Sequence, residues 1–148
     1  MAFSIVFGPD KSEEMWEGQK IRVGCISIGD FTEEFTSFLD FWTPADYETQ
    51  WRAEIGRMVS GARVDALITD MHNLGTAHHL VSWPLYREDD LVFVQNRLLF
   101  LSDLGRPLHL DQLIGKLGDR STISEDGATI SEWSVGIQDL RDFLARLA

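Results

Sequence analysis

Cysteine and basic residues are both scarce in this sequence. With one cysteine among 148 residues, the chain cannot form an internal disulfide, which excludes a small disulfide-stabilised secreted fold. Lys and Arg number 13 against 24 Asp and Glu, so the formal net charge is −11. Proteins that grip a polyphosphate backbone carry a basic surface. The composition therefore argues against a nucleic-acid partner and favours a basic protein partner.

Long apolar runs and linker-like stretches are missing as well. No run approaches the roughly 20 apolar residues that cross a membrane. Residues 1–10 lack the basic start and cleavage site of a signal peptide. We therefore expect a cytoplasmic protein with no membrane partner. No Pro-, Ser- or Gly-rich linker divides the chain, so residues 1–148 are predicted to form a single domain, with residues 1–18 irregular or extended.

What is abundant is acidic charge, and it is unevenly spread. Residues 1–50 hold ten acidic and three basic side chains, a net charge of −7. Residues 51–100 carry −1 and residues 101–148 carry −3. An acidic surface of this kind promotes solubility and also attracts basic partners.

Alternating apolar residues predict several strands. The predicted strands cover residues 19–29, 31–41, 63–71, 77–87 and 91–101, with a short strand or extended segment over 128–133. Pro84 has no donor N–H, so its strand is expected to be an edge strand or to carry a bulge there. The continuous apolar run Leu98–Leu101 predicts that part of the sheet is covered on both faces.

Three helices are predicted between or after these strands, over about residues 43–60, 109–117 and 136–147. The first has the clearest boundaries: Thr43 can serve as N-cap, Pro44 follows it, and Asp46 completes a capping box. Trp42 and Tyr47 have the spacing of a hydrophobic staple. Because the strands arrive as consecutive hairpins, the predicted fold class is α+β with an antiparallel sheet.

A search for catalytic or metal-binding residues gives little. His72, His78 and His79 beside Asp70 form the one group that resembles a metal site. His78 and His79 are expected to point to opposite faces of a strand, so they should not bind one ion together. We predict no catalytic, cofactor-binding or metal-binding residue. The tryptophans are assigned to core packing, because no basic cluster surrounds them; they are Trp42, Trp51, Trp83 and Trp133.

Three sequence blocks, taken in order, resemble a known family. The first, Phe41–Trp51, contains Phe-Trp, Asp-Tyr and Trp; the second contains Trp83–Asp89 and Val92–Asn96; the third is Ile130–Trp133. Together they resemble the CdiI immunity proteins of bacterial contact-dependent growth inhibition systems, in the branch whose toxin is a ribonuclease that acts on ribosomal RNA. The resemblance covers about residues 25–147.

The resemblance implies both a fold and a function. The implied fold is α+β, with a curved antiparallel sheet and flanking helices. The implied function is non-catalytic: the protein would bind the C-terminal toxin domain of a cognate CdiA effector and block it in the cytoplasm. Two other functions stay open. A nucleic-acid or small-ligand binding module would use the concave face of the sheet, and a small hydrolase would use the region His72–His79.

The charge pattern suggests which residues would contact such a toxin. A nuclease that grips phosphates needs a basic cleft, and an inhibitor gains fast and selective association by presenting carboxylates to it. We therefore hypothesise a toxin-binding surface formed by acidic residues of the segment 30–48 and the predicted turn 88–90. Its residues are Asp30, Glu33, Glu34, Asp40, Glu88, Asp89 and Asp90.

Overall fold

The structure is a computed structural model that describes residues 2–8 and 14–147. Within these residues the strands form two antiparallel sheets, A and B, accompanied by three helices. The predicted α+β class with antiparallel pairing is confirmed, but the strands divide between two sheets rather than forming one. The helices are α1 (Pro44–Val59), α2 (Leu110–Gly115) and α3 (Ile137–Leu147).

Sheet A is built around one long strand. Its described strands are β1 (Phe3–Phe7), β2 (Glu14–Trp16), β3 (Gln19–Ile28) and β4 (Phe31–Phe38). β1 and β2 pair with successive parts of β3 along one edge, and β4 pairs with the other edge. At Gly24, the ring of Phe35 on β4 lies where a Cβ would be, so this position of β3 requires glycine.

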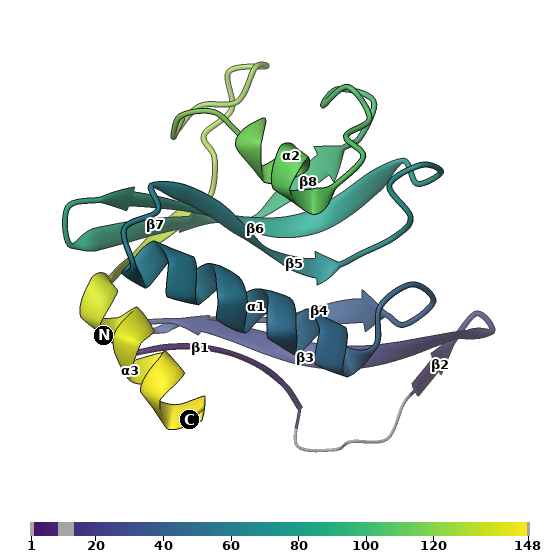
Figure 1. Ribbon diagram of the computed structural model, residues 1–148, viewed down its shortest axis with the longest axis horizontal. Coiled ribbons are helices and arrows are strands. Elements are labelled where there is room, and N and C mark those ends of the chain that lie inside the picture. Colours follow the sequence, from purple (N-terminus) through teal and green to yellow (C-terminus); the bar gives the residue numbers. More distant parts are fainter. Residues whose placement is uncertain (1, 9–13, 148) are drawn as a thin grey trace.

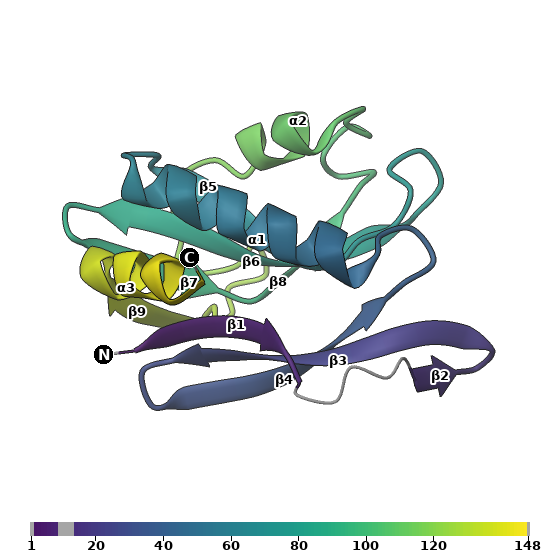
Figure 2. The same ribbon diagram turned by 60° about the horizontal axis from the view of Figure 1, so that its bottom comes forward.

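Sheet B has β6 as its central strand. The strands described are β5 (Val64–Asp70), β6 (His79–Glu88), β7 (Leu91–Gln95), β8 (Arg97–Phe100) and β9 (Glu132–Gly136). β5 pairs with one edge of β6, β7 and β8 pair with the other, and β9 pairs with β7. In Figure 1, sheet B lies above sheet A, α1 runs along both, and α2 covers the face of sheet B that points away from sheet A. Figure 2 shows the same layers and places α3 beside β1 and β9.

The first helix begins as the sequence predicts. The Asp46 backbone N–H donates to the Thr43 hydroxyl at 3.2 Å, and the Thr43 N–H donates to the Asp46 carboxylate at 2.9 Å. The rings of Trp42 and Tyr47 are in contact, with centroids 5.2 Å apart. The capping box and the staple are therefore both confirmed, and they fix where the chain enters α1.

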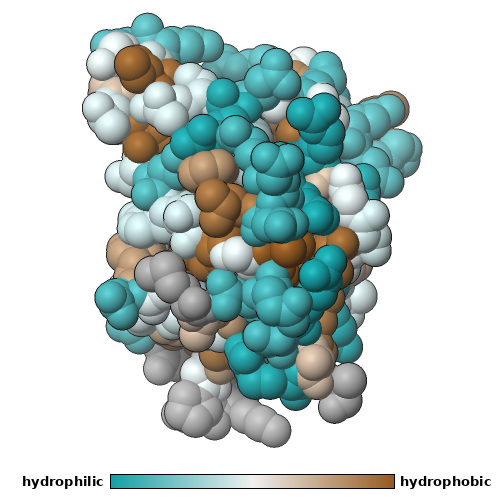
Figure 3. All heavy atoms as spheres, turned by 90° about the vertical axis from the view of Figure 1, so that its left-hand side faces the viewer, coloured by the Kyte–Doolittle hydropathy of each residue, from teal (hydrophilic) through white to brown (hydrophobic). Residues whose placement is uncertain are grey.

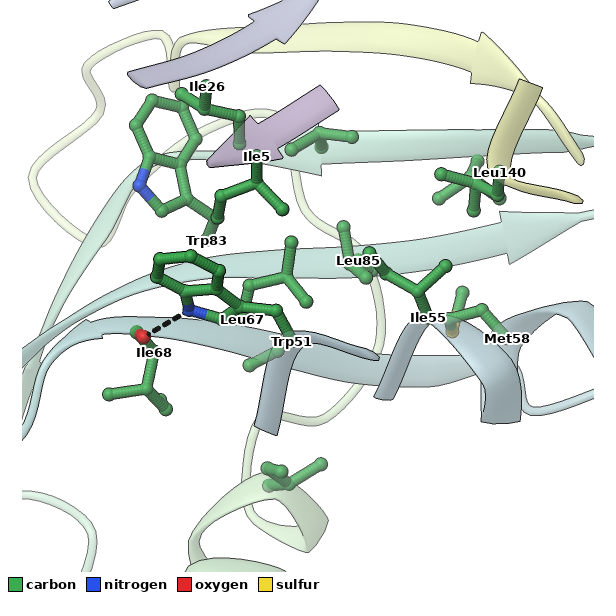
Figure 4. Close-up of a cluster of buried hydrophobic side chains, with 14 of the residues drawn as sticks. Ile5, Ile26, Trp51, Ile55, Met58, Leu67, Ile68, Trp83, Leu85 and Leu140 are labelled. Carbon is green, nitrogen blue, oxygen red and sulfur yellow. Dashed lines mark hydrogen bonds between the residues drawn. The ribbon is translucent and has the colours of Figure 1, made fainter. Parts of the chain in front are cut away.

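One face of α1 closes the outer edge of β5. The Gln50 amide donates to the Ala66 carbonyl at 2.9 Å and accepts from the Ile68 N–H at 3.0 Å. The Trp51 indole donates to the Ile68 carbonyl at 2.7 Å, which is the dashed line in Figure 4. A sheet edge with unpaired backbone groups would otherwise be open to other chains. The helix therefore satisfies this edge while its apolar side chains enter the core.

The core lies between α1 and the facing sides of the two sheets. Figure 4 shows Trp51 and Ile55 from α1 packed near Trp83 and Leu85 from β6, with Ile26 from sheet A close by. Trp51 and Trp83 are 2% and 1% exposed, and the Trp133 ring stacks on Phe31 at 3.9 Å. Trp42 packs partly buried against the same core. These four tryptophans pack as the sequence predicts.

The predicted strand 91–101 is interrupted at Asn96, and this interruption explains how the central strand β6 can contain Pro84. β7 and β8 keep one register against β6 on both sides of the break, and Trp83 and Pro84 lie opposite it. Ala66, the partner of Pro84 on β5, directs its carbonyl to Gln50, so the missing N–H of Pro84 faces the interruption. β6 is a central strand, so the edge-strand alternative is wrong. The irregularity in the pairing with β5 lies between Ile68 and Asp70, not at Pro84, where the ladder on the other side opens instead.

The prediction of two-sided coverage holds for one strand and fails for another. Residues 65–70 of β5 are all buried, because α1 and sheet A lie on one side and α2 on the other. In the run 98–101, only Leu99 and Leu101 are buried; Leu98 and Phe100 are each 49% exposed. β8 is therefore covered on one face only.

The two terminal regions also differ from prediction. β1 contributes Phe3 and Ile5 to the core, where the sequence predicted no strand; residues 1 and 9–13 of that region lie outside the described residues. The strand expected at 128–133 is instead β9, because Glu132 pairs with Gln95 and the ladder continues to Gly136. No helix within the described residues has the length and apolar character needed to cross a membrane.

Candidate protein-binding surfaces

The seven acidic residues predicted to bind a partner do not form one surface. Asp30 lies in the turn between β3 and β4, Glu88 is the last residue of β6, and Asp89 and Asp90 form the turn between β6 and β7. Both turns are at the left of Figures 1 and 2, and we call this the hairpin end. Glu33 and Glu34 lie on β4. Asp40 follows β4 at the opposite end, which also holds His72–His79 and which we call the histidine end.

At the hairpin end, the side chain of Arg120 forms ion pairs with two carboxylates. Arg120 donates to Glu88 at 3.1 Å and to both oxygens of Glu132, at 2.5 and 2.8 Å. Its guanidinium also lies 3.7 Å from the ring centroid of Phe93. The hydrogen bonds from Arg120 lower the pKa of the Glu132 carboxyl group. One guanidinium thus faces two carboxylates, and the Glu88 side chain stays 56% exposed.

A second arginine ties this hairpin to α1. Arg87 donates to the carbonyl of Met58 at 2.7 Å and to the carbonyl of Asp89 at 2.9 Å. A cation at the carbonyl end of a helix is favourable because it meets the negative end of the helix dipole. Asp89 and Asp90 remain exposed beyond it. Figure 3, which faces this end, shows a mostly hydrophilic surface with hydrophobic residues between the polar ones.

A buried pair of carboxyl groups lies under the same end of β5. Asp65 is fully buried, and burial together with a hydrogen bond to Glu54 raises the pKa of its carboxyl group to about 8. The nearest cation is Arg57, whose Nε is 3.8 Å from the Asp65 carboxylate. A cavity of about 670 Å³ lies nearby, lined by Arg57 and Asp111 among others, but Asp65 does not line it. A carboxyl group without access to a substrate has a structural role here.

At the histidine end, one imidazole lies between two carboxylates. His72 Nε2 is 3.0 Å from Asp70, and His72 Nδ1 is 3.4 Å from Asp40. Asp70 is almost fully buried and also accepts from the Phe38 N–H at 3.3 Å. Both ring nitrogens can donate only when the imidazole is protonated. The hydrogen bond to Asp70 accordingly raises the pKa of His72.

The three neighbouring histidines share a cavity but no metal-binding geometry is present. His72, His78 and His79 line a cavity of about 450 Å³ together with Asp40 and Phe41. His79 is the first residue of β6 and His78 directly precedes it, and both line this cavity. Among the described residues, no group of three His, Cys, Asp or Glu side chains is placed to hold a metal ion.

Exposed apolar side chains adjoin this cavity, and the sequence did not reveal them. Phe41 is 46% exposed, and Leu98 and Phe100 on β8 are each 49% exposed. The Phe100 ring contacts His79 at a centroid distance of 6.2 Å. We call Phe41, His79, Leu98 and Phe100 the β8 patch. The sequence does not show which side chains of β8 are exposed, because the residues on both of its faces are apolar from 98 to 101.

Comparisons with known proteins agree with one another. A family model described as the CdiI N-terminal domain matches residues 37–143. The immunity protein CdiI of Enterobacter cloacae subsp. cloacae is 31% identical over 129 residues, which cover 86% of this chain and 87% of that protein. A solved structure described as a CdiA-CT/CdiI toxin and immunity complex from Enterobacter cloacae has a TM-score of 0.86 and 28% identity, and the match covers 98% of this chain and 97% of the other.

Proposed function

The chain belongs to the CdiI family of immunity proteins, and from this premise we propose that it binds and neutralises the C-terminal toxin domain of a cognate CdiA effector. The observation that carries the proposal is the match over nearly the whole length of both chains to a protein from a toxin and immunity complex. The producing cell would be protected because its own toxin is held inactive.

We further propose that the toxin is a ribonuclease with a basic cleft and that neutralisation takes place in the cytoplasm. The net charge of −11 supports this, because an acidic inhibitor associates quickly with a basic cleft and repels other acidic proteins.

The seven acidic residues remain our hypothesis for the contact with the toxin. All of them are exposed except Glu33, which is half-buried and accepts a hydrogen bond from the Asn96 amide at 3.1 Å. Glu88 contacts Arg120 and Asp40 contacts His72, but their side chains stay 56% and 48% exposed. Exposed carboxylates speed association with a basic partner.

The function is tested with the C-terminal toxin domain of the cognate CdiA effector. We expect the two to co-purify, and we expect added chain to stop the toxin domain from cleaving ribosomal RNA in isolated ribosomes. A toxin domain from an unrelated CdiA is the control and should stay active. Binding should weaken as salt rises. An unaffected cleavage rate at saturating chain would disprove the proposal.

The same material tests the open alternative of a nucleic-acid binding module. A gel-shift experiment with RNA at moderate salt should show no complex with this chain, because a net charge of −11 opposes binding to phosphates. A specific RNA complex in the absence of toxin would favour that alternative instead.

A further inference from the structure

The β8 patch lies at an open edge of sheet B. β8 pairs with β6 on one side, and no strand of the described residues pairs with its other side. The Leu101 N–H donates to the His78 carbonyl at 3.0 Å, which makes Phe100 and His79 a non-hydrogen-bonded pair of the ladder. The backbone N–H groups of Phe100 and Leu98 therefore point away from β6, toward the open edge.

The side chains at this edge are also unlike those of a protected edge. Natural edge strands are shielded by charged residues, proline or a bulge. Here Leu98 and Phe100 alternate with buried Leu99, so two large apolar side chains project from the same face, each about half exposed. The ring of Phe100 contacts His79, and His79 and Phe41 line the same cavity, so the β8 patch extends from β8 to Phe41. Adjacent exposed apolar side chains are a feature of interaction surfaces.

Carboxylates flank the patch on two sides. Asp40 lines the cavity with His79 and Phe41. Glu33 is bonded to Asn96, the residue directly before β8. An apolar centre with a charged rim is the usual construction of a protein interface, in which the centre supplies most of the affinity and the rim steers association.

We propose that the toxin domain docks on the β8 patch, with Leu98 and Phe100 at the centre of the contact and Glu33 and Asp40 at its rim. This inference rests on the proposed function and narrows it, because it assigns the contact to the histidine end and not to the hairpin end. The occupant is a basic partner and not a second copy of this chain. Two copies would bring together equal acidic rims, each on a chain of charge −11.

The experiment compares apolar side chains of similar exposure at the two ends. Leu98→Ala and Phe100→Ala are compared with Leu91→Ala, which lies beside Asp90 at the hairpin end and is 47% exposed. Binding to the cognate toxin domain is measured by calorimetry. We expect the dissociation constant to rise about tenfold or more for Leu98→Ala and Phe100→Ala. It should change less than about twofold for Leu91→Ala.

Two further measurements keep the result unambiguous. Thermal unfolding should be nearly unchanged in all three variants, because the side chains are half exposed. Hydrogen exchange of the wild-type chain should slow at residues 97–101 when the toxin domain is added, and should not slow at 88–91.

The possible failures are distinct. If the wild-type chain does not bind the toxin domain, the proposed function and this inference both fall. If it binds and only Leu91→Ala weakens the complex, or exchange slows only at 88–91, the docking assignment alone is wrong. It is also wrong if the chain alone sediments as a dimer that Leu98→Ala dissociates, since a second copy would then cover the patch.

Discussion

The hairpin end and the histidine end both carry acidic side chains, but the groups around those side chains differ. At the hairpin end, Arg120 bridges Glu88 and Glu132, and Arg87 binds backbone carbonyls of the hairpin and of α1. At the histidine end, the carboxylates of Asp40 and Asp70 enclose an imidazole beside exposed apolar side chains. Acidic charge is therefore common to both ends, and the proposal for the β8 patch depends on the apolar side chains beside that charge.

β5 connects the two ends and shows the same contrast in its buried acids. Asp65, toward the hairpin end, is buried with another carboxyl group, so its neutral form is favoured. Asp70, toward the histidine end, is nearly as buried but accepts hydrogen bonds from a backbone N–H and an imidazole. One strand thus holds one acid whose neutral form is favoured by burial beside a second carboxyl group, and one whose carboxyl group contacts a backbone N–H and an imidazole.

The largest expected effect comes from reversing charge at the rim of the β8 patch. We expect Glu33→Lys with Asp40→Lys to weaken toxin binding by about 10- to 100-fold, because like charges would then face each other across the interface. The matched double variant Asp89→Lys with Asp90→Lys introduces the same charge at the hairpin end, and it should weaken toxin binding only about twofold. The dissociation constants and the association rates of both double variants are measured at low and moderate salt.

These two double variants also test the broader acidic hypothesis. If both weaken binding equally, long-range attraction by the whole acidic surface dominates, and the distinction between the ends disappears. If neither changes the affinity or its salt dependence, the acidic residues do not steer the toxin at all.

The second prediction concerns the buried acid of β5. Burial raises the pKa of Asp65 to about 8, so the folded chain holds a proton that the unfolded chain releases near the ordinary carboxyl pKa. Stability from this group is complete at acid pH and is lost as pH rises toward about 8. We therefore expect Asp65→Asn to stabilise the chain by about 1–2 kcal/mol near pH 9 and by much less near pH 5.

Asp70→Asn is the control for this prediction at the other end of the same strand. It removes the charge that His72 contacts, so we expect it to lower the free energy of unfolding rather than raise it. Denaturant unfolding at several pH values measures both variants. Stabilisation by both would mean that burial, not the local partners, decides the effect of each acid.

How far the sequence predicts this fold depends on how local each signal is. The start of α1 was predictable to the residue, because Thr43, Pro44 and Asp46 act within one turn. β1 was missed, because Phe3, Ile5 and Phe7 form a pattern too short to distinguish from an extended tail. Its place is fixed by pairing with β3, about twenty residues away, which no local pattern encodes.

The candidate site was predicted less well for the same reason. The acidic residues were visible in the sequence, but the pairing of Asp40 with His72 joins residues far apart in the chain. Leu98 and Phe100 were read as core because all four residues of their run are apolar. Which face of β8 is covered depends on where sheet A ends relative to sheet B, and this is a property of the packed molecule.

A third prediction tests whether the hairpin end is a structural unit. We expect Arg120→Ala to lower the free energy of unfolding by about 1 kcal/mol, because the two-pronged contact with Glu132 and the packing on Phe93 are lost. Toxin affinity should be unchanged within about twofold. Glu132→Gln keeps the shape of the partner and separates charge from packing. A large loss of affinity with unchanged stability would instead place the interface at this end.

The smallest expected effect comes from the charge on His72. The hydrogen bond to Asp70 raises its pKa in the folded state, so its contribution to stability is complete below its unfolded pKa and is lost as pH rises through the folded value. His72→Gln should therefore cost more stability near pH 5.5 than near pH 8.5, with a difference of about 0.5 kcal/mol, since the ring is a quarter exposed. The control makes the same substitution in the Asp70→Asn background, where its pH-dependent effect should be smaller because only the contact of His72 with Asp40 remains. Equal pH dependence in both backgrounds would show that the imidazole at this end draws no stability from Asp70, and the difference between the two ends of β5 would then rest on Asp65 alone.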